Sequence, residues 1–181
     1  MIKVGLDIGN SKISCVVCDL IINHQPKILS FVSLPTSNLN KSIFINFQSI
    51  KEEIKEIIER SAKESETDIK SIYLNIPLSG SSSIFYNSEI NIENELINEL
   101  HLKKAINKSF FFEQSDNQEI LMNYILNYEI DEKIISGSPV GNFANKLNLN
   151  FYKIFVDQNI INTYKNLFYE LKIHIAHLVP T

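Results

Sequence analysis

The opening of this 181-residue chain constrains its fold most. Two apolar segments, Ile2–Ile8 and Ile13–Leu20, flank the polar residues "GNSK", in which Gly9 and Asn10 tolerate positive φ. A second turn at Asn23–Pro26 leads into "KILSFVSL". β-Branched and apolar residues bounded by turn residues are typical of strands. The chain is therefore predicted to begin as a three-stranded antiparallel meander.

Two amphipathic helices alternate with further strands. Ser49 and Glu52 form a candidate capping box for the first helix, and Asp157 is a candidate cap for the last. Their apolar stripes are Ile50, Ile54, Ile57, Ile58 and Ala62, and Ile160, Ile161, Tyr164, Leu167, Phe168 and Leu171. The strands "SIYLNIPL" (Ser71–Leu78) and "KIHIAHLVP" follow the two helices. This order predicts an α/β fold around one sheet.

The segment between the strand at Ser71–Leu78 and the last helix has a different sequence pattern. "SGSSS" (Ser79–Ser83) is expected to be a turning connection, followed by a strand at Ile84–Ile92. Asn98 caps a short predicted helix, and strands are expected at Glu119–Ile130 and in "KLNLNFYKIFVD", with the turn-rich "GSPVGN" between them. We therefore predict one α/β sheet that is interrupted by a small α+β insertion and then resumed.

Composition and residue spacing exclude several classes of function. An apolar content of 44% indicates a globular chain, and a net charge of −4 gives no basis for nucleic-acid binding. No stretch approaches the roughly 20 apolar residues of a membrane span, so a cytoplasmic protein is expected. Cys15 and Cys18 lie three apart on a predicted strand, as do His174 and His177, so each pair should point to opposite faces. No metal site or disulfide is predicted.

The turn of the first hairpin is a candidate phosphate-binding site. Its backbone N–H groups can converge on an anion, with Gly9 allowing close approach and Asn10 and Ser11 adding donors. Lys12 supplies a positive charge. Asp7 would repel phosphate unless Mg²⁺ and its waters lie between them. The motif alone is short, and a plain tight turn is the alternative interpretation.

The order of elements resembles the first half of the actin/Hsp70/sugar-kinase ATPase fold, and within it the bacterial cell-division family FtsA. "GLDIGNSKI" is similar to the family's first phosphate loop, "INELHLKKAI" to a helix of its inserted subdomain, and "SPVGNFANKLNLNFYKIFV" to its P-V-G loop and exit strand. The resemblance implies subdomain IA at residues 1–78 and 157–181, and an SHS2-like subdomain IC between them. It implies an ATP and Mg²⁺ site at Asp7, Gly9, Asn10, Ser11 and Lys12, with the second phosphate loop outside these residues.

The same resemblance implies a scaffold. FtsA-like proteins polymerise, link FtsZ filaments of the Z ring to the cytoplasmic face of the membrane, and recruit later proteins of the divisome. We expect self-association and partner binding through subdomain IC. The FtsZ-docking lobe and the membrane-binding C-terminal helix of the family lie outside the matched half. No catalytic residue is assigned, and at most weak ATPase activity is expected in a two-lobed form. The alternatives are a PilM-like pilus-assembly protein and a phosphotransferase or ATPase of the same superfamily.

Overall fold

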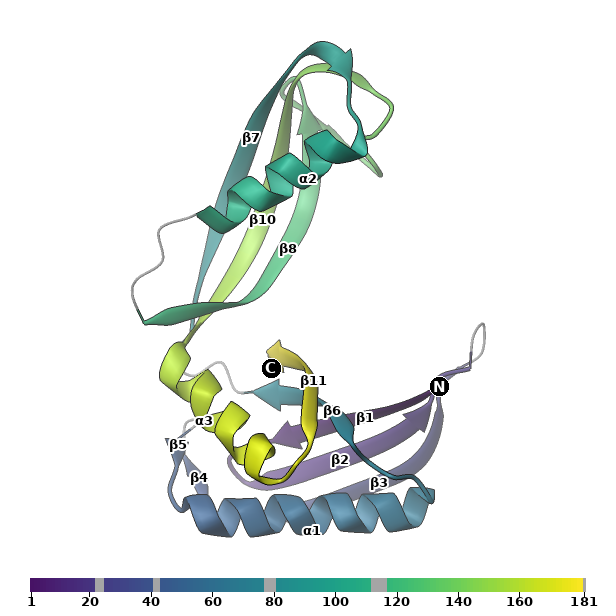
Figure 1. Ribbon diagram of the computed structural model, residues 1–181, viewed down its shortest axis with the longest axis vertical. Helices are drawn as coiled ribbons and strands as arrows, with labels where there is room; N and C mark the ends of the chain where they lie inside the picture. Colours follow the sequence, from purple (N-terminus) through teal and green to yellow (C-terminus); the bar gives the residue numbers. More distant parts are fainter. Residues whose placement is uncertain (22–24, 41–42, 77–80, 112–116, 181) are drawn as a thin grey trace. The chain divides into compact units, whose positions relative to one another are not determined.

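The computed structural model describes residues 1–21, 25–40, 43–76, 81–111 and 117–180. The chain divides into two compact units (Figure 1). Unit 1 comprises Met1–Gly80 and Asp157–Thr181, and unit 2 comprises Ser81–Val156. None of the described helices has the length and hydropathy needed to cross a membrane.

Unit 1 is built on a five-stranded sheet with the order β11-β6-β1-β2-β3. The strands are β1 (Ile2–Ile8), β2 (Lys12–Asp19), β3 (Lys27–Pro35), β6 (Ser71–Ile76) and β11 (His174–Pro180). The first three are antiparallel neighbours, which confirms the predicted meander, whereas β6 runs parallel to both β1 and β11. A two-stranded ribbon, β4 (Leu39–Asn40) and β5 (Ile43–Phe44), precedes the first helix. Of the second predicted turn, Asn23 and His24 lie outside the described residues, as do residues 77 and 78 of the predicted fourth strand.

Two helices, α1 (Phe47–Ser65) and α3 (Gln158–Glu170), belong to this unit. The predicted stripe of α1 is confirmed at Ile50, Ile54, Ile57 and Ile58, which are all buried. Alternate residues of the strands, such as Val4, Leu6 and Ile8 of β1, are buried with them. The opposite face of the sheet is only partly buried or exposed along β1, β2 and β6. The core of unit 1 therefore lies on one face of its sheet.

The helix caps were predicted with mixed success. Asp157 caps α3 as expected, because its carboxylate accepts from the N–H of Asn159 at 2.7 Å. The predicted cap of α1, Ser49, is wrong. Asn46 is the cap, with extended backbone, and its side chain accepts from the N–H of Ser49 at 3.0 Å. The helix begins a turn earlier because the amide of Asn46 reaches that N–H group.

Unit 2 is a four-stranded sheet with the order β7-β10-β8-β9 and one helix. Its elements are β7 (Ser82–Leu96), α2 (Glu99–Lys108), the short 3₁₀ helix η1 (Ser109–Phe111), β8 (Gln118–Ile130), β9 (Lys133–Ile135) and β10 (Phe143–Asp157). The side chain of Asn98 caps α2 as predicted. Its Ala105 packs with buried residues of β7 and β10, among them Ile90, Leu147 and Leu149.

The structure corrects one local prediction for unit 2 and adds one strand. Ser82 and Ser83 belong to β7 and pair with β10, so they are not part of a turn; Ser79 and Gly80 lie outside the described residues. Strand β9 was not predicted. It follows a tight turn in which Asp131 and Glu132 have positive φ, 45° and 68°. Residues other than glycine seldom adopt this conformation, so the turn is hard to predict from the sequence.

Candidate functional site

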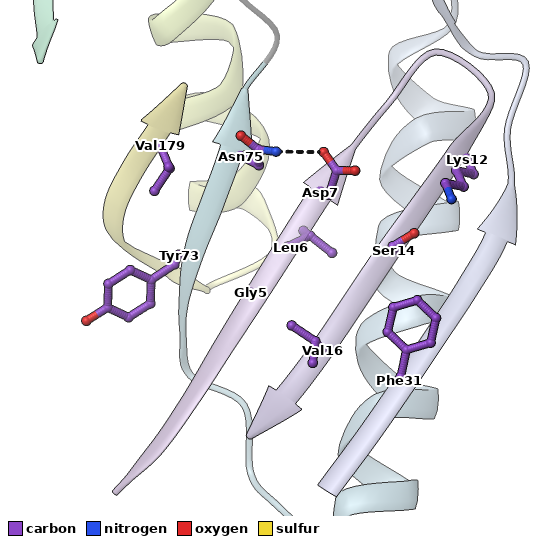
Figure 2. A pocket seen from close by; sticks show the side chains of 10 residues that line it. All are labelled: Gly5, Leu6, Asp7, Lys12, Ser14, Val16, Phe31, Tyr73, Asn75 and Val179. Atoms are coloured by element: carbon purple, nitrogen blue, oxygen red, sulfur yellow. Dashed lines mark hydrogen bonds between the residues drawn. The ribbon is translucent and has the colours of Figure 1, made fainter. Parts of the chain in front are cut away.

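A hollow of about 470 Å³ lies on the open face of the sheet of unit 1 (Figure 2). It extends over β1, β2 and β6, with one residue each from β3 and β11. The lining residues are Gly5, Leu6, Asp7, Lys12, Ser14, Val16, Phe31, Tyr73, Asn75 and Val179. Its polar groups gather near the carboxyl ends of β1 and β6, and its apolar side chains lie toward the middle of the sheet.

Asp7 is the acidic residue of this hollow. It is half-buried near the end of β1, where Ser14 on β2 and Asn75 on β6 are its partners in register. Asn75 donates its Nδ2–H to Asp7 Oδ1 at 3.0 Å (Figure 2). The Oδ1 atom of Asn75 is buried and has no hydrogen-bond partner among the described residues. The amide oxygen of Asn75 is turned away from Asp7 (Figure 2), so the carboxylate is the oxygen donor that this pair offers to a hydrated hard cation.

The turn between β1 and β2 adjoins the hollow. Gly9 donates its N–H to the carbonyl of Lys12 at 2.9 Å, and Thr36 donates its N–H to the carbonyl of Ser11 at 3.0 Å. Gly9 and Asn10 tolerate positive φ, but neither residue adopts it. Gly9 is instead favoured by space, because a Cβ there would come within 3.2 Å of the Lys12 carbonyl oxygen.

The five predicted site residues are thus divided by the structure. Asp7 and Lys12 line the same hollow, where they come from neighbouring strands. Gly9, Asn10 and Ser11 form the turn beyond it and do not line it. Asn10, Ser11 and Lys12 are exposed, so all three are accessible to a ligand at this end of the sheet.

Tyr164 is a buried polar residue behind this site. Its ring meets that of Phe44 edge to face, with centroids 4.9 Å apart, and its hydroxyl has no hydrogen-bond partner among the described residues. Burial, and secondarily the negative charge of Asp7, raises the pKa of Tyr164 well above its ordinary value. The hydroxyl therefore stays protonated and neutral near the Asp7 carboxylate.

Sequence reasoning missed several residues of the hollow. Asn75 and Tyr73 reach the site because β6 pairs in parallel with β1, across 68 residues of sequence. No local sequence pattern predicts the register of that pair. Ser14 was the one that could have been found, since it lies opposite Asp7 in the predicted hairpin. It also lies 3.0 Å from Ser33, oxygen to oxygen. Lys3 donates to the Tyr73 hydroxyl at 2.5 Å at the other end of β1.

The cysteines lie as predicted, on opposite faces of β2. Cys15 is fully buried and Cys18 is half-buried, and both thiols are free. Burial raises the pKa of the Cys15 thiol, and the Ser61 side chain opposes that shift.

The expectation that His174 and His177 point to opposite faces is wrong. The pairing of β11 with β6 shifts register between them, so they pair with Ser71 and Tyr73, which share one face of β6. Both are exposed, and His177 stacks on Tyr73. No cluster of three or more His, Cys, Asp or Glu that could hold a metal occurs among the described residues.

No protein-family model matches the chain. Among curated proteins, it is 34% identical over 107 residues to the cell division protein FtsA of Borreliella burgdorferi. That match covers 57% of this chain and 25% of the FtsA protein. The matched part is therefore about a quarter of the length of that relative.

Among solved structures, the chain is similar to one from the PilM–PilN type IV pilus biogenesis complex. The TM-score is 0.60 over 97% of this chain and 46% of that chain, with 13% sequence identity. The cytoplasmic domain of EpsL, an inner-membrane component of the type II secretion system of Vibrio cholerae, is matched over 99% of this chain and 56% of that chain, with a TM-score of 0.43 and 10% identity. The predicted fold class, an actin-like ATPase lobe with an inserted α+β subdomain, is confirmed.

Proposed function

We propose that this chain is the amino-terminal half of an FtsA-like division protein, a scaffold whose two units correspond to subdomains IA and IC. The observation that carries the proposal is the 34% identity over 107 residues to the FtsA of Borreliella burgdorferi. In this assignment IA is residues 1–78 and 157–181, and IC is residues 79–156. The protein would link FtsZ filaments to the membrane and recruit later division proteins, acting at the cytoplasmic face of the membrane.

The hollow of unit 1 fits one side of a Mg-ATP site. Lys12 and the N–H groups of the exposed turn at Asn10 and Ser11 would face the phosphates. Asp7, held by the amide N–H of Asn75, would hold the waters of Mg²⁺, which prefers oxygen ligands and keeps part of its hydration shell. The bound nucleotide would contact both lobes and so stabilise their association. No residue of this chain is assigned a catalytic role.

A second candidate function is that of a PilM-like pilus-assembly protein. The similarity to the PilM–PilN complex extends over 97% of this chain, farther than the FtsA match does. At 13% identity that similarity concerns the fold alone. The two candidates share a scaffold role and differ in partner, so the partner decides between them. A phosphotransferase remains a third possibility without an observation that favours it.

The test is binding to division and pilus partners side by side. Polymers of full-length FtsA from Borreliella burgdorferi are formed on lipid with Mg-ATP, and the 181-residue polypeptide is added at increasing ratios. We expect shorter polymers in electron micrographs, because the polypeptide offers the inserted unit to a neighbour but no second lobe to the next subunit. It should not retain an FtsZ tail peptide in a pulldown. Unchanged polymers together with retention of PilN would replace the FtsA assignment with the PilM-like one.

A further inference from the structure

Helix α2 and the 3₁₀ turn η1 cover one face of the sheet of unit 2 (Figure 1). The inner side of α2 is its apolar side. Ala105 is fully buried there, and Leu102 and Ile106 pack against the same core. No element in the described part of unit 2 packs against the outer side. That side differs from an ordinary solvated helix face because large apolar side chains are exposed at its two ends.

Two large apolar side chains lie exposed on that outer side. Leu100, in the first turn, is 73% exposed, and Phe111, at the end of η1, is 85% exposed. Between them lie Lys103, Lys104, Asn107 and Lys108, and all six residues line one groove of about 560 Å³. Their spacing of three and four places them on a single helix face. We call this set of six the α2 groove.

The α2 groove is positively charged, although the whole chain carries −4. Lys103 and Lys104 form no ion pair with any described carboxylate, including Glu99 on the same helix. Lys108 donates its Nζ–H to the backbone carbonyl of Glu89 at 2.8 Å, which fixes its position without neutralising its charge. Three cations therefore lie between two apolar side chains along one shallow, open groove.

We propose that the α2 groove binds an acidic peptide segment of another protein, with carboxylates in its middle and an apolar residue at each end. Charge complementarity selects the acidic middle, and exposed Leu and Phe side chains provide the kind of contact that dominates peptide affinity. Phe111 lies eleven positions after Leu100, a rise of about 16 Å, which an extended segment spans with about five residues. This inference stands on unit 2 alone and goes beyond the proposed function.

A bilayer is the rival ligand for a basic helix with exposed apolar residues. Interfacial helices carry a continuous apolar face with lysines along its margins. In the α2 groove the arrangement is reversed, because the lysines occupy the centre of the face and the apolar residues its two ends. The geometry favours a peptide.

The experiment is a fluorescence-anisotropy titration of the full chain with labelled peptides. The probes carry Leu at one end and Phe at the other, with about three to six alternating Asp and Glu residues between them. We expect saturable binding that is best at one spacing and weakens as salt is raised from 50 to 300 mM, because exposed charge pairs are screened. Lys103→Glu with Lys104→Glu should weaken binding at least about tenfold, and Leu100→Ser with Phe111→Ser to a similar degree.

The matched control is Lys27→Glu with Lys133→Glu, which makes the same change in net charge at exposed positions outside the groove. It should bind the acidic peptide within about twofold of the unchanged chain. Circular dichroism confirms that each variant is folded. Absence of saturable binding for the whole series at about 1 mM overturns the proposal. So does lysine-dependent binding to phosphatidylserine vesicles in place of the peptides, which would assign the α2 groove to a membrane surface.

Discussion

Individual residues of β2 differ in chemistry because the strand has one covered and one open face. Cys15 faces the core, where burial raises its pKa, and Cys18 lies half-buried on the other face with its Sγ near the Lys3 carbonyl. Because the thiolate is the reactive form, iodoacetamide at pH 8 should modify Cys18 first and Cys15 only as the chain unfolds. Mass spectrometry of a time course measures this. A Cys18→Ser variant is the control, and rapid labelling of its Cys15 under native conditions would contradict the buried assignment.

The same thiol gives a pH dependence with a definite sign. The pKa of Cys15 is higher in the folded chain than its ordinary value of 9.0. Below pH 9.0 the thiol is protonated in both states, and its contribution to stability is fully present. Above that value the unfolded chain loses the proton first, so stability falls as the pH rises toward the folded pKa. Cys15→Ala should reduce this loss in urea titrations at pH 8 and pH 10.

At the candidate site, the sequence predicts contacts between residues that are close along the chain and misses contacts between residues that are far apart along it. Asp7 and Lys12 are flanking residues of one hairpin, so an alternating pattern with a polar turn is enough to place them near each other. Asn75 joins Asp7 through parallel pairing of β6 with β1, 68 residues away in sequence. The requirement for glycine at position 9 is of the same kind, since the close Lys12 carbonyl, and not φ, restricts that position.

At the scale of elements, the strands and helices follow from hydrophobic periodicity, and their ends do not. Strand β1 has the predicted bounds, and α1 and α3 bury most of their predicted stripes; Ala62, Ile160 and Leu171 are only partly buried. Caps and short strands depend on single side chains and on positive φ values, as at Asn46 and at the turn before β9. Fold class was therefore accessible from the sequence, whereas several boundaries were not.

The cap of α1 gives a test of one such boundary. Asn46→Ala removes the side-chain acceptor for the Ser49 N–H and should lower the free energy of unfolding by about 1 kcal/mol. Ser49→Ala is the matched control, because Ser49 contributes its backbone N–H and the substitution retains it. Urea denaturation of both variants decides the matter. A larger loss for Ser49→Ala than for Asn46→Ala would restore Ser49 as the cap.

At the scale of the whole molecule, unit 2 has a core of its own. Eight buried residues, including Ile90, Ala105 and Phe151, form one cluster within Ser81–Val156. A polypeptide of residues 79–156 should therefore fold alone, although with low stability for its small size. Amide hydrogen exchange should show protection in β7 and β10, which pair over most of their length. Uniformly fast exchange in those strands would show that unit 2 depends on unit 1.

The nucleotide site provides the last test at this scale. The hollow of unit 1 is a single open face that offers Asp7, Asn75 and Lys12 to one side of a ligand. A cleft that buries a nucleotide needs a second wall, since small ligands are held by burial of most of their surface. We therefore expect no Mg-ATP binding by the 181-residue polypeptide at submillimolar concentration in titration calorimetry. Binding with micromolar affinity would contradict this one-sided site.

The same titration in a two-lobed chain separates an incomplete site from an absent one. Fusion of these residues to the second lobe of the Borreliella FtsA should restore binding, because the fusion supplies the opposite wall. In that fusion, Lys12→Ala should weaken binding by about 1.5–3 kcal/mol, the range for a hydrogen bond to a charged group. Lys27→Ala, a lysine that does not line the hollow, should have no effect. Equal losses for both variants would mean that Lys12 acts through general charge and does not contact phosphate.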